Sequence, residues 1–217
     1  MNLILLGPQG SGKGTQAKLL AEKYNLEHIN TGGILRQIAK SGTPIGEKID
    51  RMINVDRILI PSDILKEVLS LKIKSLNREK GIISDGTPRK VDQIEYFEDM
   101  IAQTGRKISH LIFINVSEEE AIERITKRWM CEKCKKVLIM GKDVQSPNDQ
   151  CPDCEAPIIQ RADDTLDGIR KRLDIFKNET IPVIEKFRER GLLIEINGKQ
   201  SVEKVFQDIC KKIDDSN

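Results

Sequence analysis

The feature that most constrains this chain is a glycine-rich stretch at residues 7–15, with the sequence Gly-Pro-Gln-Gly-Ser-Gly-Lys-Gly-Thr. It follows the apolar run at residues 2–6 and precedes a helix-like segment that begins at Gln16. A buried strand that leads through a glycine-rich turn into a helix is the context that a phosphate-binding loop requires. Glycines let the backbone approach phosphate oxygens, and the unpaired N–H groups at a helix start attract a polyphosphate. The alternative is a simple turn in an ordinary α/β protein.

Lys13 would supply a mobile positive charge for the outer phosphates, and a nearby hydroxyl would reach the magnesium shell. Gly14 stands between Lys13 and Thr15, so the usual Gly-Lys-Ser/Thr spacing is off by one residue. The residues expected to bind ATP in this loop are Gly10, Ser11, Gly12, Lys13, Gly14 and Thr15.

The pattern Gly-Pro-x-Gly-x-Gly-Lys-Gly-Thr-Gln near the start of the chain resembles the nucleoside monophosphate kinases, and the adenylate kinases most closely. The resemblance covers essentially the whole chain. It implies an α/β fold of the P-loop containing nucleoside triphosphate hydrolase type, with a five-stranded parallel sheet and helices on both faces. It also implies a small helical insertion and a zinc-binding lid.

Length and composition agree with a single sizeable domain that carries insertions. The chain has 217 residues, and 36 Lys and Arg against 34 Asp and Glu give a net charge of +2, which argues against a nucleic-acid-coating protein. Aromatic residues make up only 4% of the chain, so stacking platforms for single strands are scarce. No apolar run is long enough for a membrane span, and no secretory signal follows Met1. We therefore expect a cytoplasmic protein.

The resemblance divides the chain into three parts. The core nucleotide-binding domain would comprise residues 1–29, 61–128 and 162–217. Residues 30–60 would form an AMP-binding insertion, and residues 129–161 a zinc-binding lid.

The entrance to the acceptor site is expected at residues 28–36, where an apolar segment ends in Thr-Gly-Gly. The resemblance implies that Thr31 contacts the acceptor base, that Arg36 grips its phosphate, and that backbone near Ile60 lines the base pocket. Gly33 replaces the usual Asp, which would be a good helix N-cap, so we expect this entrance to lose about 0.5 kcal/mol. Before Pro61 the usual glycine is missing, and the loop is one residue longer than in the family.

The segment Asp-Gly-Thr-Pro-Arg at residues 85–89 ends the next predicted strand, where a doubly wound sheet places ligand chemistry. By resemblance, Asp85 holds magnesium through water, Gly86 lies against AMP, and Arg89 takes the monophosphate in a bidentate manner. Gln93 keeps the spacing of a base-reading amide. Thr87 replaces the usual aromatic residue and weakens the apolar wall of the acceptor pocket. The alternative for Asp85 and Arg89 is a surface ion pair.

A further strand is predicted at residues 111–116, followed by a helix with an acidic first turn. Arg124 and Arg128 lie four residues apart and are predicted to share one face of that helix. The resemblance makes Arg124 the residue that stacks on the donor adenine and Arg128 a phosphate clamp. Two solvated charges are the alternative.

The second strong motif is a pair of Cys-x-x-Cys units, Cys131 with Cys134 and Cys151 with Cys154, separated by 16 residues. This spacing predicts a four-cysteine structural zinc site, or iron in a heterologous preparation, and redox pairing of the cysteines is the alternative. Trp129 is placed to pack this unit onto the body of the protein. The Tyr-His pair usual in the family is replaced around Val137 and Leu138, which we assign to the ATP contacts of the lid.

Beyond the cysteines, Arg161 and Arg172 match arginines that the family places on the transferring phosphoryl group and on AMP. Asp163 and Asp164 are expected at the hinge, where they would hold Arg128 or Arg161. A last strand at residues 192–196 leads to Gln200, whose backbone would touch the donor adenine. The predicted catalytic residues are Lys13, Asp85, Arg89, Arg128, Arg161 and Arg172.

The implied reaction is the reversible transfer of the terminal phosphoryl group from magnesium-bound ATP to AMP, which gives two ADP. The expected cofactors are Mg²⁺ and a structural Zn²⁺, and the expected partners are ATP, AMP and ADP, with no nucleic acid or membrane and a monomeric chain. Gly33 and Thr87 leave open a kinase for another nucleoside monophosphate. A nucleotide-gated module that binds RNA through the cysteine unit is the alternative from a different class.

Overall fold

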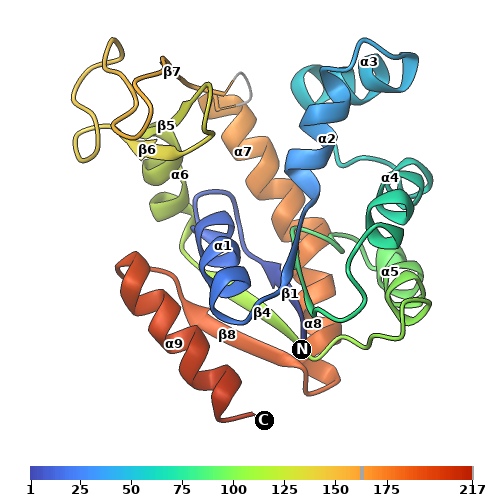
Figure 1. Cartoon of the computed structure of the whole chain (residues 1–217). Helices are drawn as coiled ribbons and strands as arrows, with labels where there is room; N and C mark the ends of the chain where they lie inside the picture. The colour runs from blue at the N-terminus through green and yellow to red at the C-terminus, as the bar shows by residue number, and fades with distance from the viewer. Residues whose placement is uncertain (162–163, 217) are drawn as a thin grey trace.

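The computed structural model describes residues 1–161 and 164–216 and contains a central sheet of five parallel strands (Figure 1). The strands, in their order across the sheet, are β2 (Glu27–Asn30), β3 (Ile82–Asp85), β1 (Asn2–Leu6), β4 (His110–Asn115) and β8 (Leu193–Asn197). Every neighbouring pair is parallel, for example Leu5 beside Asp85 and Leu6 beside Phe113. The predicted five-stranded α/β architecture is confirmed.

Helices cover both faces of this sheet (Figure 1). The helices of the core are α1 (Lys13–Lys23), α4 (Ser62–Lys74), α5 (Asp92–Ala102), α6 (Glu118–Thr126), α7 (Leu166–Ile175), α8 (Ile181–Glu189) and α9 (Val202–Asp214), with a short π-helical turn η2 (Phe176–Thr180) before α8. Because side chains alternate along a strand, Ile4 and Leu6 pack with α4, α5 and α8, whereas Leu3 and Leu5 pack with α1 and α9. Burial on both faces explains why β1 is a continuous apolar run.

The predicted AMP-binding insertion at residues 30–60 contains α2 (Thr31–Ala39), α3 (Pro44–Asp50) and a π-helical turn η1 (Arg51–Asp56). Arg57, directly after η1, adopts a left-handed conformation with φ of 54°. This segment therefore contains one widened helical turn, followed by an arginine in a conformation that glycine usually supplies.

The expectation that Gly33 weakens the helix cap is wrong. The N-cap of α2 is Asn30, three residues before Gly33, and its side chain accepts a 2.8 Å hydrogen bond from the Gly33 N–H. Gly33 therefore lies inside the first turn and donates to the cap.

The predicted lid at residues 129–161 lies on a three-stranded antiparallel sheet in the order β6 (Val137–Ile139), β5 (Arg128–Cys131) and β7 (Ile158–Ile159). Its apolar cluster is separate from the clusters of the core and contains the buried residues Cys131, Leu138, Val144, Cys151 and Ile158. Trp129 packs against this cluster, and its predicted contact with the body of the protein stays a prediction. Arg128 opens β5 after α6 has ended at Thr126, so the prediction that Arg124 and Arg128 share a helical face is wrong.

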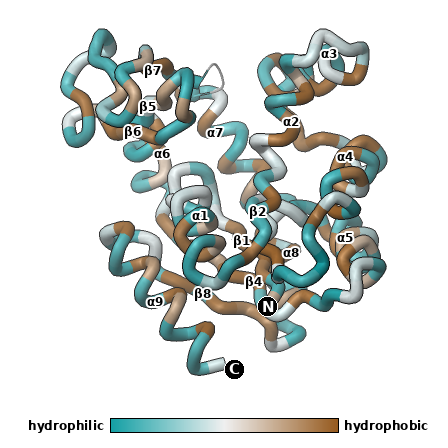
Figure 2. The backbone as a smooth tube through the Cα atoms, in the orientation of Figure 1, coloured by the Kyte–Doolittle hydropathy of each residue, from teal (hydrophilic) through white to brown (hydrophobic). Residues whose placement is uncertain are grey.

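The lid and the insertion lie on the same side of the molecule, and both termini lie at the opposite end (Figure 1). In Figure 2, hydrophobic residues follow the strands of the central sheet, whereas the outer loops of the lid are largely hydrophilic. Among the helices in residues 1–161 and 164–216, none combines the length and apolar character needed to cross a bilayer.

Candidate active site

The glycine-rich stretch forms the connection between β1 and α1, as predicted. Gly10 and Gly12 adopt left-handed conformations with φ of 83° and 85°, and Gly12 is the N-cap of α1. A Cβ atom at Gly10 would lie 2.8 Å from the backbone oxygen of Ala121, so only glycine fits there. Gly12 has no side chain to cap the helix, and the first turn of α1 contains no acidic residue, so neither competes with an anion at this helix N-terminus.

Lys13 lies half-buried at the start of α1, where its Nζ donates to the Pro8 carbonyl over 3.3 Å. Burial lowers the pKa of Lys13 to about 7, Asp85 acts in the opposite direction, and the positive charges of Arg89, Arg128 and Arg161 lower the value further. Residues from four distant parts of the chain therefore converge on one electropositive site. A bound polyphosphate would stabilise the ammonium form of Lys13.

Asp85 ends β3 and is buried beside the phosphate-binding loop. Burial raises the pKa of Asp85, but the neighbouring His28 together with the charges of Lys13 and Arg89 outweighs this effect and holds the pKa below its usual value. The His28 Nε2 and Asp85 Oδ2 atoms are 3.7 Å apart, which is too long for a hydrogen bond but close enough for electrostatic attraction. Asp85 is therefore a carboxylate and can serve as an outer-sphere ligand of a divalent cation.

Sequence reasoning missed His28. The signal was available in the strand order, because β2 lies beside β3 in parallel register with His28 opposite Ile83 and Asn30 opposite Asp85. Residues two apart on adjacent strands point to the same face of a sheet. Placing His28 next to Asp85 from the sequence therefore required knowing which strands are neighbours.

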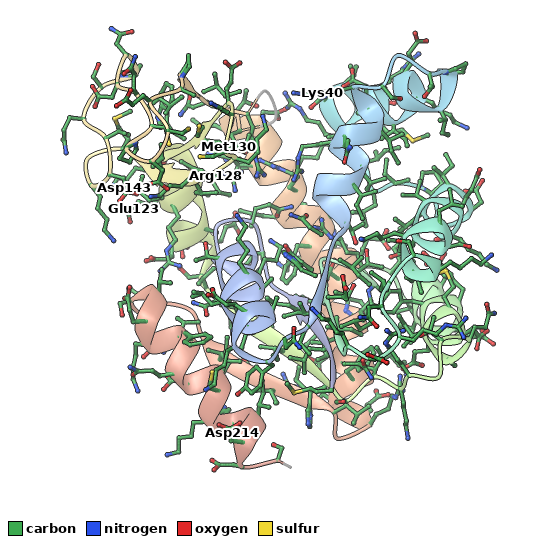
Figure 3. All side chains as sticks on the ribbon, in the orientation of Figure 1. Lys40, Glu123, Arg128, Met130, Asp143 and Asp214 are labelled. Carbon is green, nitrogen blue, oxygen red and sulfur yellow. The ribbon has the colours of Figure 1, made fainter. Side chains whose placement is uncertain are left out.

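Two arginines converge on one buried carboxylate where the lid joins α7. Arg128 binds Asp164 through Nε at 2.9 Å and Nη2 at 2.6 Å, and Arg172 Nη2 binds the same carboxylate at 2.9 Å. The Asp164 side chain is 0% exposed, and each arginine side chain is 14% exposed. Figure 3 shows Arg128 at the base of the lid. The predicted contact between Asp164 and Arg128 is confirmed, whereas Asp163 lies outside the described residues.

The predicted acceptor residues lie around Arg89. Burial lowers the pKa of Arg89, Asp85 raises it, and the charges of Arg36 and Arg172 lower it again, so the three arginines lie close enough to interact electrostatically. The Arg89 side chain is fixed by its Nε, which donates to the Gly86 carbonyl over 2.9 Å. The buried Gln93 accepts from the Arg89 backbone N–H at 2.8 Å through Oε1.

Thr31 is also buried on this side of the site, at the first residue of α2. Ile60 is buried in the same apolar cluster as Leu35 and Ile49, so only its backbone remains for a nucleotide. Arg161 belongs to the group through its charge, which acts on Lys13, and its Nη2 lies 3.9 Å from the Met130 sulfur.

On the donor side, Arg124 connects two loops. Its Nη2 donates to the Gly198 carbonyl after β8 over 3.0 Å, its Nη1 lies 3.5 Å from the Gly10 carbonyl, and its Nε binds Glu120. Its stacking on the donor adenine stays a prediction.

For the other residues predicted to contact ATP, side-chain exposure and hydrogen bonding indicate which atoms could reach the nucleotide. Val137 is exposed, whereas Leu138 is fully buried in the lid cluster, so a nucleotide contact at Leu138 would come from its backbone. The Gln200 amide is engaged with Asp208 and with the Asn197 carbonyl, which is compatible with the predicted backbone contact at this position.

The four lid cysteines form a candidate metal centre. Their Sγ atoms all lie within 4.8 Å of one another, with 3.4 Å between Cys131 and Cys154 and 3.6 Å between Cys134 and Cys151. Tetrahedral zinc with Zn–S bonds of about 2.3 Å separates its sulfur ligands by roughly 3.8 Å, so the arrangement fits zinc. All four are free thiols in the described chain, as the metal interpretation requires.

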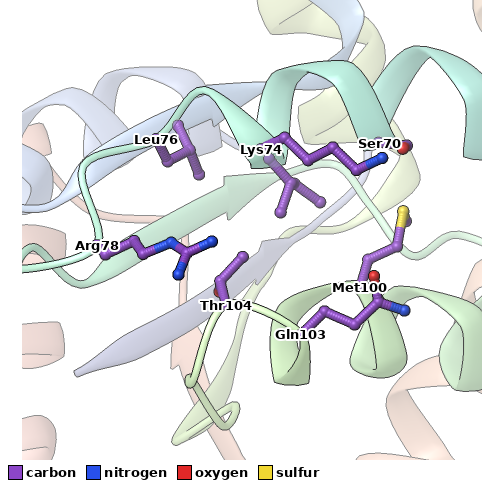
Figure 4. A pocket seen from close by; sticks show the side chains of 8 residues that line it. Ser70, Lys74, Leu76, Arg78, Met100, Gln103 and Thr104 are labelled. Carbon is purple, nitrogen blue, oxygen red and sulfur yellow. The ribbon is translucent and has the colours of Figure 1, made fainter.

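A separate pocket lies between the C-terminal ends of α4 and α5 (Figure 4). Lys74, Arg78 and Thr104 are among the residues that line it. None of the predicted site residues lines this pocket, so we do not assign it to the nucleotide site.

Comparisons with known proteins agree with this geometry. A family model described as adenylate kinase matches residues 5–192. An adenylate kinase of Kosmotoga olearia is 38% identical over 215 residues, which cover 99% of this chain and 99% of the relative. Adenylate kinases of Geotalea daltonii, at 38% identity with 96% and 97% coverage, and of Archaeoglobus fulgidus, at 35% identity with 96% coverage of both chains, are also similar.

Proposed function

Because the chain belongs to the adenylate kinase family of phosphotransferases, we propose that it catalyses the magnesium-dependent transfer of the terminal phosphoryl group of ATP to AMP, which gives two ADP. The observation that carries this proposal is the convergence of Lys13, Arg89, Arg128 and Arg161 beside the carboxylate of Asp85. A cluster of cations around one open site suits two polyphosphates and a transition state with dispersed negative charge.

In the proposed reaction, an oxygen of the AMP phosphate attacks the γ-phosphorus of ATP, and the bond from this phosphorus to the bridging oxygen of ADP breaks. The loop from Gly10 to Thr15 and Lys13 hold the donor phosphates. Arg36 and Arg89 hold the AMP phosphate, while Arg128, Arg161 and Arg172 stabilise the transferring group. Asp85 would hold Mg²⁺ through water, and the ion would neutralise phosphate charge.

The lid is proposed to exclude water by closing over the donor phosphates, a motion for which adenylate kinase is itself a standard example. We propose residues 129–161 as the lid and residues 30–60 as the AMP-binding insertion. Zinc in the lid would be structural, because four sulfur ligands leave no open coordination position.

A coupled assay of ADP formation with AMP, CMP, UMP and GMP as acceptors tests the proposal. We expect AMP to give the highest kcat/KM, because Thr31 and Gln93 supply polar groups to an adenine edge. Lys13→Met is expected to lower kcat by about 10² or more without unfolding the protein. A preference for CMP or UMP would favour a kinase for another nucleoside monophosphate. No activity with any acceptor, combined with RNA binding, would favour the binding module.

The pKa of Lys13 gives a test that does not depend on turnover. In the free protein Lys13 is largely neutral above about pH 7, and bound phosphates raise its pKa. Binding of a non-hydrolysable ATP analogue at pH 8 should therefore take up protons, and the uptake should fall toward zero as the pH drops below 7. Calorimetry in buffers of different ionisation enthalpy measures it. Equal uptake by the Lys13→Met variant would contradict the assigned role.

A further inference from the structure

The hydroxyl groups of Thr31 and Thr87 form a buried pair between the insertion and the loop after β3. Their Oγ1 atoms are 2.9 Å apart, and the two residues are 4% and 1% exposed. Thr31 opens α2, and Thr87 lies between Asp85 and Arg89. The hydroxyl that replaces an aromatic side chain at position 87 therefore has a specific polar partner.

Other hydrogen bonds fix the loop around Thr87. The Thr87 carbonyl accepts from the Ser84 hydroxyl at 2.8 Å, and the Gly86 N–H donates to the Leu5 carbonyl at 3.2 Å. The Gly86 carbonyl accepts from Arg89 Nε. With its backbone held in this way, the Thr87 hydroxyl has a fixed position relative to Thr31.

The proton of the Thr87 hydroxyl has two acceptors within reach, because the Thr31 Oγ1 and the Gly86 carbonyl oxygen are each 2.9 Å away. A hydroxyl donates one hydrogen bond and accepts up to two. If Thr87 donates to Thr31, the Thr31 proton is left for a ligand. If Thr87 donates to Gly86, Thr31 donates to Thr87 and offers only lone pairs.

The direction of this hydrogen bond decides which base Thr31 can bind. Adenine presents an exocyclic amine that donates, where guanine presents a carbonyl oxygen that accepts. A preference for adenine therefore requires the direction in which Thr87 donates to the Gly86 carbonyl and Thr31 donates to Thr87, because Thr31 then offers only lone pairs to the base. A buried donor or acceptor that is left unpaired by the wrong base lowers its affinity.

We propose that Thr87 is a positioning residue that sets the hydrogen-bond direction of Thr31 and, through it, the preference for the acceptor base. The proposal rests on the proposed function, which places Thr31 at that base. Thr87 acts through Thr31 and has no assigned contact with the transferring phosphoryl group.

The test compares Thr87→Val, which keeps the shape and removes the hydroxyl, with Thr87→Ser, which keeps the hydroxyl. Thr87→Val should raise the KM for AMP by about 2- to 13-fold and lower the preference for AMP over GMP, while the KM for ATP stays within about twofold. Thr87→Ser should retain the preference of the wild type. Circular dichroism checks folding, and Thr87→Ala replaces the valine variant if that variant does not fold.

A double-mutant cycle with Thr31→Val asks whether Thr87 acts through Thr31. In the Thr31→Val background, Thr87→Val should change the AMP preference by less than about twofold. An unchanged preference in the Thr87→Val variant, fully additive effects, or an equal rise in the KM for ATP would overturn the proposal. These outcomes leave the proposed function intact, whereas a wild-type protein that is inactive with all four acceptors would overturn both.

Discussion

The predicted lid and the predicted acceptor insertion both interrupt the core sequence, but their apolar side chains pack in different clusters. Leu35 and Ile49 of the insertion belong to the same apolar cluster as β1, whereas the lid has a cluster of its own around Cys131 and Cys151. The insertion is therefore an extension of the core. The predicted lid has a small apolar cluster of its own, and we expect a bound metal to support its few apolar side chains.

The ion pairs that connect these two segments with the region of α7 also differ, because one is buried and the other is exposed to solvent. At the base of the lid, Arg128, the first residue of β5, and Arg172 of α7 bind Asp164, whose side chain is fully buried. On the insertion side, Arg57 pairs with Asp167, whose side chain is 87% exposed. Breaking the buried Asp164 ion pairs should cost much free energy, whereas solvent weakens the exposed pair of Arg57 with Asp167.

Metal removal should give the largest difference between the two segments. We expect about one zinc per chain, and its loss should unfold or loosen the lid, because binding to structural sites of this kind contributes roughly 10 kcal/mol or more in small zinc domains. Hydrogen exchange after chelation, or in Cys151→Ser, should rise in residues 129–161 and stay unchanged at Ile49. Residual activity should remain, since the zinc ligands have no proposed contact with phosphate. A metal-free protein with the same lid protection and activity would contradict the comparison.

The buried ion pairs should give the next largest effect. Asp164→Asn leaves Arg128 and Arg172 without their shared carboxylate and should destabilise the protein by about 3–5 kcal/mol. The matched change Asp167→Asn should cost less than about 1 kcal/mol, because its carboxylate is solvated. Urea denaturation of both variants measures the difference. Equal losses would show that the two links are energetically alike.

Alanine substitutions of two fully buried aliphatic residues, one in each apolar cluster, compare how the clusters contribute to stability. Ile49→Ala should lower the global free energy of unfolding by about 2–5 kcal/mol, because Ile49 packs with the core. Leu138→Ala should act on local opening of the lid and change the global value little. Chemical denaturation reports the first quantity and hydrogen exchange the second. An equal loss of global stability in Leu138→Ala would show that the lid unfolds together with the core.

The smallest predicted effect concerns the cap of α2. Asn30→Ala removes the hydrogen bond to the Gly33 N–H and should cost about 1 kcal/mol. Because α2 shares the core, this loss should appear in the global midpoint. The control Asn30→Asp, which keeps a capping oxygen, should stay close to the wild type in thermal denaturation.

The sheet and the phosphate-binding loop could be predicted because their signals are local. The run at residues 2–6 and the glycines that follow it specify a buried strand, a turn and a helix start without reference to distant residues. The Cys-x-x-Cys pairs are local in the same sense, and their thiols meet as the spacing predicts.

The errors arose where the outcome depended on tertiary contacts. The end of α6 at Thr126 moves Arg128 into a strand, although its spacing from Arg124 fits a helix. The cap at Asn30 and the pairing of Thr31 with Thr87 also depend on neighbours that a single segment does not reveal. Side-chain partners across 56 residues are set by strand order, which periodicity alone does not give.

The position of Trp129 gives this molecule a built-in optical probe. It is the single tryptophan of the sequence, and it lies in β5 against the cysteine-rich cluster of the lid. The two tyrosines, Tyr24 and Tyr96, belong to the core. Selectively excited indole emission therefore reports on the lid alone, whereas far-ultraviolet circular dichroism reports on the whole chain, and a difference between the two melting curves would measure the independence of the lid without any label.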